Sequence, residues 1–175
     1  MELILIRHTT PDIEKGICYG QSDIPLADTF MKELIPILQF IPVDDASVAY
    51  YSSPLTRCKT LAEQLATDVI FDDRIKELDF GDWELKYWGD LDRDEVDTWM
   101  NDFVNAPTKN GESYLDLHER THYFLEDLKK KKHKKAIVVT HGGVIRSITA
   151  HIKNTSLLNS FDTPLNYGSI VKFTL

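Results

Sequence analysis

Two short runs of apolar residues, each followed by a histidine, place the strongest constraint on the fold. Residues 3–6 (LILI) and 136–140 (AIVVT) show almost no alternation of polar and apolar residues. Such runs are typical of strands that are buried on both faces of a parallel sheet. His8 follows the first run after one arginine, and His141 follows the second run directly. The sequence therefore predicts an α/β fold in which two buried strands lead into histidines.

The rest of the chain alternates between strand-like and helix-like patterns. These patterns predict strands at 47–51, 69–71 and 169–175, and helices at 29–40, 55–66, about 92–103, 113–130 and 142–151. This order predicts a three-layer α/β/α sandwich with a mostly parallel central sheet. The sequence has no linker and no internal repeat, so we expect residues 1–175 to form a single domain.

Proline and serine mark the ends and the weak points of three predicted helices. Pro36 lies inside the helix at 29–40, where a proline costs about 3 kcal/mol, so a kink or a split is expected there. Ser53 followed by Pro54 is typical of an N-cap and a first helical residue. Ser113 is expected to cap the helix that follows it.

Composition and charge exclude several classes of protein. A net charge of −8 argues against a nucleic-acid partner, which requires a basic surface. No apolar run is long enough to span a membrane, and the first eight residues do not resemble a secretory signal, so we expect a cytoplasmic protein with no membrane partner. The two cysteines, Cys18 and Cys58, form no CxxC motif, which argues against a disulfide framework and a structural zinc site.

The predicted strand ends bring four basic side chains together. Arg7 and His8 follow one strand, His141 follows another, and Arg57 lies in the first turn of the helix after a third. Parallel strands have their carboxyl ends at one edge of the sheet, where open α/β folds bind ligands. Two guanidinium groups match the oxygens of a phosphate, and the helix that begins near Gly142 offers backbone N–H groups to an anion. Nearby positive charge favours a neutral imidazole, which is a competent nucleophile.

Five short motifs occur in the order found in the histidine phosphatase (phosphoglycerate mutase-like) superfamily. They are RHT at 7–9, SPLTR at 53–57, ELDFGDWE at 77–84, GES at 111–113 and VTHGG at 139–143. The segments GICYG at 16–20 and DIPL at 23–26 resemble the alpha-ribazole phosphatase branch. Members of that branch remove the 5′-phosphate of alpha-ribazole phosphate during cobalamin biosynthesis.

The resemblance implies a role for each matching residue. His8 would be the nucleophile that forms a phosphohistidine, and Glu77 would protonate the leaving group and then activate water. Arg7, Arg57 and His141 would hold the phosphoryl oxygens. The substrate would be a small phosphomonoester, and no metal or other cofactor is implied, because these basic groups supply the charge stabilisation. Thr9 and Gly142 are also expected to contact phosphate.

The sequence departs from the family pattern at two places. Thr9 stands where the signature usually has glycine, although threonine there fits the ribazole branch. Glu14 stands where many members have a phosphate-contacting asparagine, so we expect Glu14 to point away from the site. For Glu77, an ion pair with Arg74 or Lys76 is the alternative to a catalytic role.

Several further residues are expected to cover or support the site, or to have no functional role. Residues 79–109 are rich in aromatic and acidic side chains and are expected to form a small helical cap over the site. Their aromatic rings could stack on a flat substrate or pack among themselves, and the sequence does not decide between the two. Glu84 is expected to accept backbone N–H groups. His118, His122 and His151 are expected to be exposed helical residues without partners.

Four other functions compete with an alpha-ribazole phosphatase. A broad-specificity phosphatase fits the same motifs. A mutase requires longer insertions around the substrate than this chain has. An inactive phospholigand-binding protein would lack the nucleophile or the acid, yet both are present. A metal-dependent hydrolase would place a cation beside two arginines, which repel it. The sequence does not indicate an oligomeric state.

Overall fold

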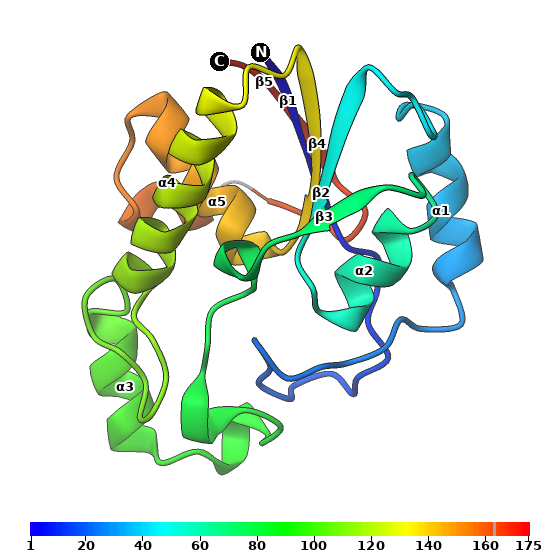
Figure 1. Cartoon of the computed structure of the whole chain (residues 1–175). Helices are drawn as coiled ribbons and strands as arrows, with labels where there is room; N and C mark the ends of the chain where they lie inside the picture. Colours follow the sequence, from blue (N-terminus) through cyan, green and yellow to red (C-terminus); the bar gives the residue numbers. More distant parts are fainter. Residues whose placement is uncertain (163) are drawn as a thin grey trace.

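Five strands form one sheet in the order β3-β2-β4-β1-β5 (Figure 1). The computed structural model describes residues 1–162 and 164–175. The strands are β1 (Glu2–Arg7), β2 (Val48–Ser52), β3 (Val69–Phe71), β4 (Lys135–Thr140) and β5 (Ile170–Thr174). The first four run parallel to their neighbours, and β5 runs antiparallel to β1 at the edge. The predicted mostly parallel sheet is confirmed.

Helices cover both faces of this sheet. The helices α1 (Phe30–Leu38) and α2 (Thr56–Ala62) lie on one side, and α4 (Tyr114–Lys130) and α5 (Gly142–Lys153) lie on the other (Figure 1). The short α3 (Arg93–Asn101) lies on the side of α4, near the end of α4 that is remote from the chain termini. This arrangement confirms the predicted three-layer sandwich.

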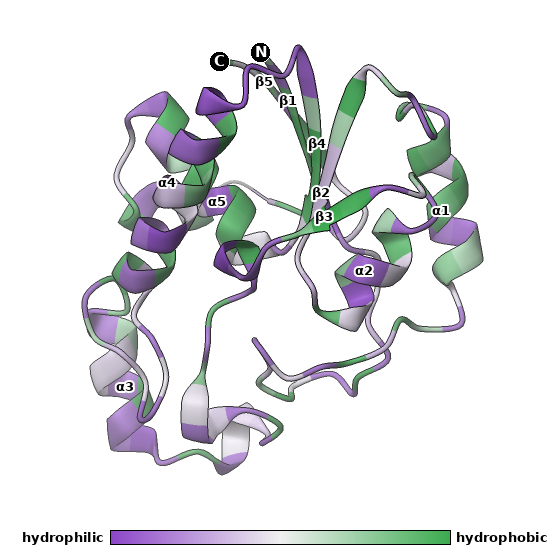
Figure 2. Ribbon diagram, viewed as in Figure 1, coloured by the Kyte–Doolittle hydropathy of each residue, from purple (hydrophilic) through white to green (hydrophobic). Residues whose placement is uncertain are grey.

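Two apolar clusters, one on each face, hold the layers together. Successive side chains of a strand point to opposite faces. Leu3 and Leu5 of β1 therefore join the cluster beneath α4 and α5, whereas Ile4 and Ile6 join the cluster beneath α1 and α2. Alternate residues of β4 divide in the same way. Figure 2 shows the hydrophobic colouring along the middle of the sheet and the hydrophilic colouring on much of the visible surface of α4.

A split of the helix at Pro36 and a cap at Ser53 are both wrong, whereas a kink at Pro36 stays a prediction. α1 continues through Pro36, because Leu34 and Ile37 are buried on either side of it while Pro36 itself faces solvent. Tertiary packing outweighs the local cost of the proline. α2 begins only at Thr56, with Leu55 as its N-cap, so Ser53 is not the cap. The predicted cap at Ser113 is confirmed, with Asp116 completing a capping box.

Two long connections lie at the carboxyl ends of the parallel strands. Residues 10–29 and 79–109 both pass below this edge of the sheet in Figure 1. Glu84 joins them, because its carboxylate accepts hydrogen bonds from the backbone N–H groups of Gln21 (2.7 Å) and Phe80 (3.1 Å). The predicted structural role of Glu84 is confirmed. Across the described residues, no helix combines the length and apolar character needed to cross a bilayer.

Four single 3-10 turns complete the described elements. They are η1 (Asp73–Ile75), η2 (Gly81–Trp83), η3 (Trp88–Asp90) and η4 (Leu158–Phe161). The first is tied to the sheet, because the Thr140 hydroxyl donates to the Ile75 carbonyl at 2.7 Å. This bond fixes the start of the segment that carries Glu77.

Candidate active site

The parallel register of β1 and β4 brings the two histidines together. Arg7 pairs with Thr140, so the next residue of each strand, His8 or His141, leaves the sheet at the same level. The backbone N–H of His8 still donates to the Thr140 carbonyl at 3.0 Å. The ring centroids of His8 and His141 lie 5.2 Å apart, edge to face. Residues 133 positions apart in sequence therefore form one pair.

The end of β2 supplies a partner for His141. The Ser53 backbone N–H donates to the Val139 carbonyl at 3.0 Å, which continues the ladder one residue beyond β2. As a result the Ser53 hydroxyl lies 2.8 Å from His141 Nε2. Cys58 Sγ lies 3.4 Å from the same nitrogen. Ser53 thus orients an imidazole ring, which explains its position better than the predicted cap does.

Arg57 is fully buried and is held by a loop of the first long connection. Its guanidinium donates to the Ser22 carbonyl at 2.8 Å and to the Gly20 carbonyl. A Cβ at Gly20 would lie 1.7 Å from the Leu78 carbonyl oxygen, so only glycine fits there. The Tyr19 ring lies 5.4 Å from the guanidinium carbon. Within residues 1–162 and 164–175, Arg57 has no carboxylate partner.

Arg7 lies on the other side of the histidine pair. Its guanidinium donates to the Leu165 carbonyl, and its carbon lies 4.1 Å from the centre of the Tyr167 ring. The Tyr167 ring also lies 5.5 Å from the ring of His8. The hydroxyls of Tyr167 and Tyr19 are 2.7 Å apart, so these two tyrosines join above the two arginines.

Burial and positive charge keep both imidazoles neutral. Burial, followed by the charges of Arg57 and Arg7, lowers the pKa of His8 to about 3. The pKa of His141 also lies well below its usual range, chiefly because of burial and then because of Arg57. Both effects disfavour the charged form of an imidazole. The two rings are therefore unprotonated at neutral pH.

The hydrogen bond of His8 determines which nitrogen is free. His8 Nδ1 lies 2.7 Å from the Thr9 carbonyl oxygen. A carbonyl can only accept a hydrogen bond, so Nδ1 carries the proton and Nε2 keeps its lone pair. A neutral ring with a free Nε2 is the form that can attack an electrophile.

Glu77 is held at the beginning of α5. Its carboxylate accepts from the Gly143 N–H at 3.1 Å and from the Leu78 N–H at 3.0 Å. A Cβ at Gly143 would lie 2.3 Å from Glu77 Oε1, so a side chain there would displace the carboxylate. The alternative ion pairs do not form, because Arg74 pairs with aspartates 72 and 127, and Lys76 pairs with Asp73.

Arg120 fixes the backbone that carries Glu77. Its guanidinium donates to the carbonyls of Arg74 (2.8 Å), Lys76 (2.6 Å) and Glu77 (2.9 Å). Glu112 accepts two hydrogen bonds from the same guanidinium, one of them 3.0 Å long at Nε, and forms an ion pair with it. This network joins α4 to the segment after η1.

A cavity of about 230 Å³ opens beside these groups. Arg7, His8, Glu77 and Gly142 line it, as predicted from the sequence. Its other lining residues are mostly apolar, namely Ile17, Tyr19, Leu78, Phe80, Trp88, Tyr114, Gly143, Arg146 and Phe161.

Three predicted site residues, Arg57, Thr9 and His141, are fully buried and do not line the cavity as it stands. Thr9 Oγ1 is buried with no hydrogen-bond partner among the described residues, so its role as a phosphate contact stays a prediction. Glu14 is exposed and accepts a hydrogen bond from the Tyr87 hydroxyl at 2.5 Å, so it points away as expected.

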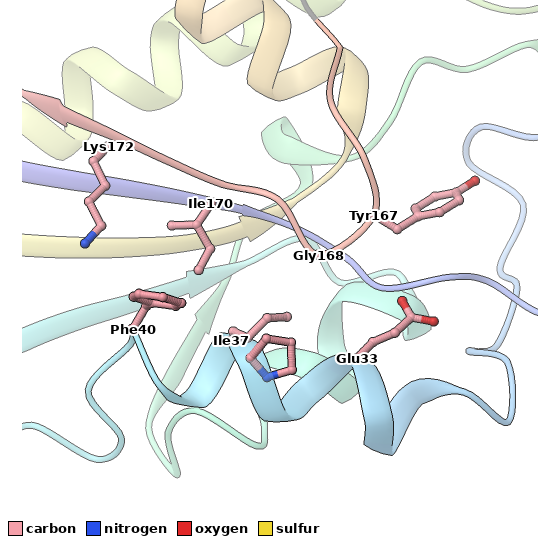
Figure 3. Close-up of a pocket in the computed structure, with 8 residues that line it drawn as sticks. Glu33, Ile37, Phe40, Tyr167, Gly168, Ile170 and Lys172 are labelled. Carbon is pink, nitrogen blue, oxygen red and sulfur yellow. The ribbon is translucent and has the colours of Figure 1, made fainter.

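A larger cavity of about 620 Å³ lies between α1 and β5 (Figure 3). Its wall is mostly apolar, with Ile37, Phe40 and Ile170 among the residues that line it. The Glu33 carboxylate already accepts hydrogen bonds from Thr10 and Thr29, so it is not free to bind a ligand. No imidazole or guanidinium lines this cavity, so the cavity of about 230 Å³ is the candidate active site.

Arg146 and Tyr167 belong to the site but were not predicted. Arg146 lies four residues after Gly142 on α5, so helical periodicity could have placed it on the same face. Tyr167 precedes the antiparallel strand β5, and nothing in the local sequence indicates that it returns to His8. It does so because the Gly168 N–H donates to the His8 carbonyl at 3.1 Å.

The expectation for three other histidines is wrong. His118, His122 and His151 are partly buried and lie together between α4 and α5. The rings of His122 and His151 are 4.6 Å apart, and those of His118 and His151 are 6.0 Å apart. Burial, followed by the neighbouring imidazoles, lowers the pKa of His118 and of His151. The long-range packing of two helices, which sequence periodicity does not specify, brings them together.

Comparisons with known proteins agree with this geometry. The chain is 31% identical to a metal-independent phosphoserine phosphatase of Arabidopsis thaliana, over 89% of this chain and 70% of that protein. It is 28% identical to the adenosylcobalamin/alpha-ribazole phosphatase of Escherichia coli, over 87% of this chain and 79% of that protein. The crystal structure of the alpha-ribazole phosphatase from Shigella flexneri has the same fold, with a TM-score of 0.86 at 24% identity, covering 98% and 89% of the two chains.

A family model matches almost the whole sequence as well. It spans residues 3–175 and therefore includes both histidines, both arginines and Glu77. The fold, the phosphatase relatives and this match lead to one assignment: the chain belongs to the histidine phosphatase superfamily, branch 1, and is a phosphatase.

Proposed function

We propose that this protein hydrolyses a small phosphomonoester through a covalent phosphohistidine at His8, without a metal ion. One observation carries the proposal. The neutral ring of His8, whose Nε2 carries no proton, lines a cavity together with Arg7 and Glu77, and the ring of His141 lies 5.2 Å away. The cavity therefore combines a nucleophile, a cation for phosphate and a carboxyl group for proton transfer.

In the first step, His8 Nε2 attacks phosphorus and the bond to the ester oxygen breaks. Arg7, Arg57 and His141 stabilise the phosphoryl oxygens, with the N–H groups near Gly142 and the Thr9 hydroxyl as further donors. Glu77 gives its proton to the departing alkoxide, so the alcohol leaves neutral. The buried hydrogen bond from His8 Nδ1 to the Thr9 carbonyl orients the ring during the attack.

In the second step, water breaks the phosphohistidine bond. Glu77 is now a carboxylate and accepts a proton from the water as the oxygen bonds to phosphorus. Inorganic phosphate leaves, and His8 and Glu77 return to their starting states. Guanidinium groups supply the positive charge that Mg²⁺ supplies in many phosphoryl transfers, which is why no metal is required.

The cavity wall supports alpha-ribazole 5′-phosphate as the substrate. Residues 79–109 contribute Phe80 and Trp88 to it, with their rings 5.7 Å apart. We propose that this segment acts as a small cap on which a flat aromatic leaving group stacks. Tyr19 and Ile17 extend the same apolar surface. The relatives named as alpha-ribazole phosphatases are consistent with this substrate.

One observation favours a second substrate class. Arg146 lines the cavity, and its Nε is buried with no partner among the described residues. A guanidinium in that position suits a leaving group with a carboxylate, as in phosphoserine. The relative named as a phosphoserine phosphatase is consistent with this alternative.

The covalent step predicts a labelled histidine. Rapid quenching during turnover of p-nitrophenyl phosphate should leave one acid-labile phosphoryl group on His8, detected by mass spectrometry of alkaline digests. Excess EDTA should leave turnover unchanged. The control is His8→Ala, which should show neither label nor turnover. Full turnover by this variant, or loss of wild-type activity in EDTA, would refute the proposal.

The role of Glu77 predicts a dependence on the leaving group. Glu77→Gln should slow hydrolysis of an alkyl phosphate by about 100-fold or more, the usual contribution of a general acid. Hydrolysis of p-nitrophenyl phosphate should slow much less in the first step, since p-nitrophenolate leaves without a proton. Pre-steady-state release of p-nitrophenol measures that step. Equal losses on both esters would contradict the acid role.

The neutral state of His8 predicts an acid-sensitive fold. The pKa of His8 is about 3 in the folded chain against 6.5 for the free side chain, so only the unfolded chain binds this proton between those values. This contribution to stability is present above pH 6.5 and is lost as the pH falls toward 3. Between about pH 7.5 and 5 the loss is about 2 kcal/mol, at 1.36 kcal/mol per pKa unit.

Urea unfolding at these two pH values measures the effect. When the pH is lowered from about 7.5 to 5, the free energy of unfolding should decrease in both proteins. The decrease should be about 2 kcal/mol smaller in His8→Gln than in the wild type, because glutamine does not titrate. The same fall in both proteins would show that His8 does not titrate below its usual range.

The two substrate classes predict opposite responses to two cavity variants. If alpha-ribazole 5′-phosphate is the substrate, it should give the higher kcat/KM, and Trp88→Ala should lower that value about tenfold through lost stacking. Arg146→Met should then have little effect. If a carboxylate-bearing ester such as O-phosphoserine is the substrate, Arg146→Met should cause the larger loss. Turnover of p-nitrophenyl phosphate by each variant is the control for folding.

A further inference from the structure

The packing of α4 against α5 creates a cluster of metal-ligating side chains outside the active site. His122 and Glu126 are four residues apart on α4, so they lie on the same face of the helix. His151 lies in the last turn of α5. One ligand atom from each of the three lies within 4.8 Å of the others. A histidine pair with one carboxylate from two packed helices is a common set of zinc ligands.

We propose that His122, Glu126 and His151 bind one zinc-class divalent transition-metal ion. Imidazole nitrogen and carboxylate oxygen bind Zn²⁺ at about 2.0–2.2 Å, which places tetrahedral ligand atoms about 3.3 Å apart. The three ligand atoms already lie within 4.8 Å of one another, so they must approach by at most about 1.5 Å to reach that spacing. Water completes the coordination, since all three residues are only partly buried.

An unpaired ring nitrogen in the cluster supports this proposal. His122 Nδ1 is buried and has no hydrogen-bond partner among the residues described. Buried polar atoms are nearly always paired, so an unpaired nitrogen on a ring that packs against a second imidazole supports a ligand site here. The ring of His151, 4.6 Å away, cannot satisfy both nitrogens of its neighbour.

Glu126 has a competing partner that a metal ion would replace. Its Oε1 accepts a hydrogen bond from Lys129 Nζ at 2.8 Å, and both side chains are about two-fifths exposed. An exposed pair of this kind contributes little to stability, so exchange of Lys129 for a metal ion costs little. The neighbouring His118 donates to, or accepts from, the Ser147 hydroxyl at 2.9 Å and therefore remains outside the ligand set.

The bound ion would clamp two helices that support the active site. α5 carries Gly143, which holds Glu77, and α4 carries Arg120, which holds the backbone around Glu77. The ion itself would touch no cavity residue, so its effect is on stability and not on the reaction. A ligand that binds only the folded chain raises its unfolding temperature.

Titration of the metal-free protein with Zn²⁺ tests the proposal. Competition with a chromophoric chelator should give one tight site, and Zn²⁺ should raise the unfolding temperature. His122→Gln and His151→Gln should each weaken binding by roughly tenfold or more and abolish the thermal shift, with basal phosphatase activity unchanged. Circular dichroism and that activity confirm that the variants fold.

Two further variants separate this site from other histidines. His133→Gln removes an imidazole outside the cluster and should leave the affinity for Zn²⁺ unchanged. Lys129→Gln removes the competing cation and should bind Zn²⁺ at least as tightly as the wild type does. No Zn²⁺ binding by the wild type, or undiminished binding by both His122→Gln and His151→Gln, would overturn the proposal. The second result would place the bound metal outside this cluster.

Discussion

The buried guanidinium of Arg57 is the constraint on which the rest of the site depends. A fully buried charge without a counter-ion is costly, and among the described residues this one is compensated by the backbone carbonyls of residues 20 and 22 and by the nearby ring of Tyr19. In the proposed reaction, a bound oxyanion would offset part of that cost. The same charge contributes to the low pKa values of His8 and His141 and so prepares both rings for chemistry.

A second set of residues keeps that charge and the acid in place. Glu84 accepts from Gln21 and Phe80 and thereby fixes the loop whose carbonyls hold Arg57. Arg120 and Glu112 perform the same task for the backbone of Glu77. The groups proposed to react are therefore few, and a larger number of hydrogen bonds position them. Such positioning decides whether a site is competent, because small displacements are costly.

Much of this was predictable from the sequence, for a physical reason. The apolar runs at 3–6 and 136–140 are typical of central strands, and the residues at their ends meet in the structure. The role of Ser53 could not be predicted, since its bond to His141 depends on the register between β2 and β4. The place of Tyr167 and the cluster of His122 with His151 also depend on contacts between elements far apart in the chain. Local periodicity contains no information about such contacts.

The register of the two central strands has a consequence for dynamics. His8 and His141 follow residues that are paired in neighbouring strands, and the separation of such strands is about 4.8 Å. Backbone hydrogen bonds between the two central strands therefore hold the backbone of the two histidines at this separation. Much of the cavity wall comes instead from connections and short turns, and β1, α4 and α5 contribute the rest. In the proposed reaction, motion of those connections would change how substrate enters and leaves, while strand pairing would keep the two histidines close together.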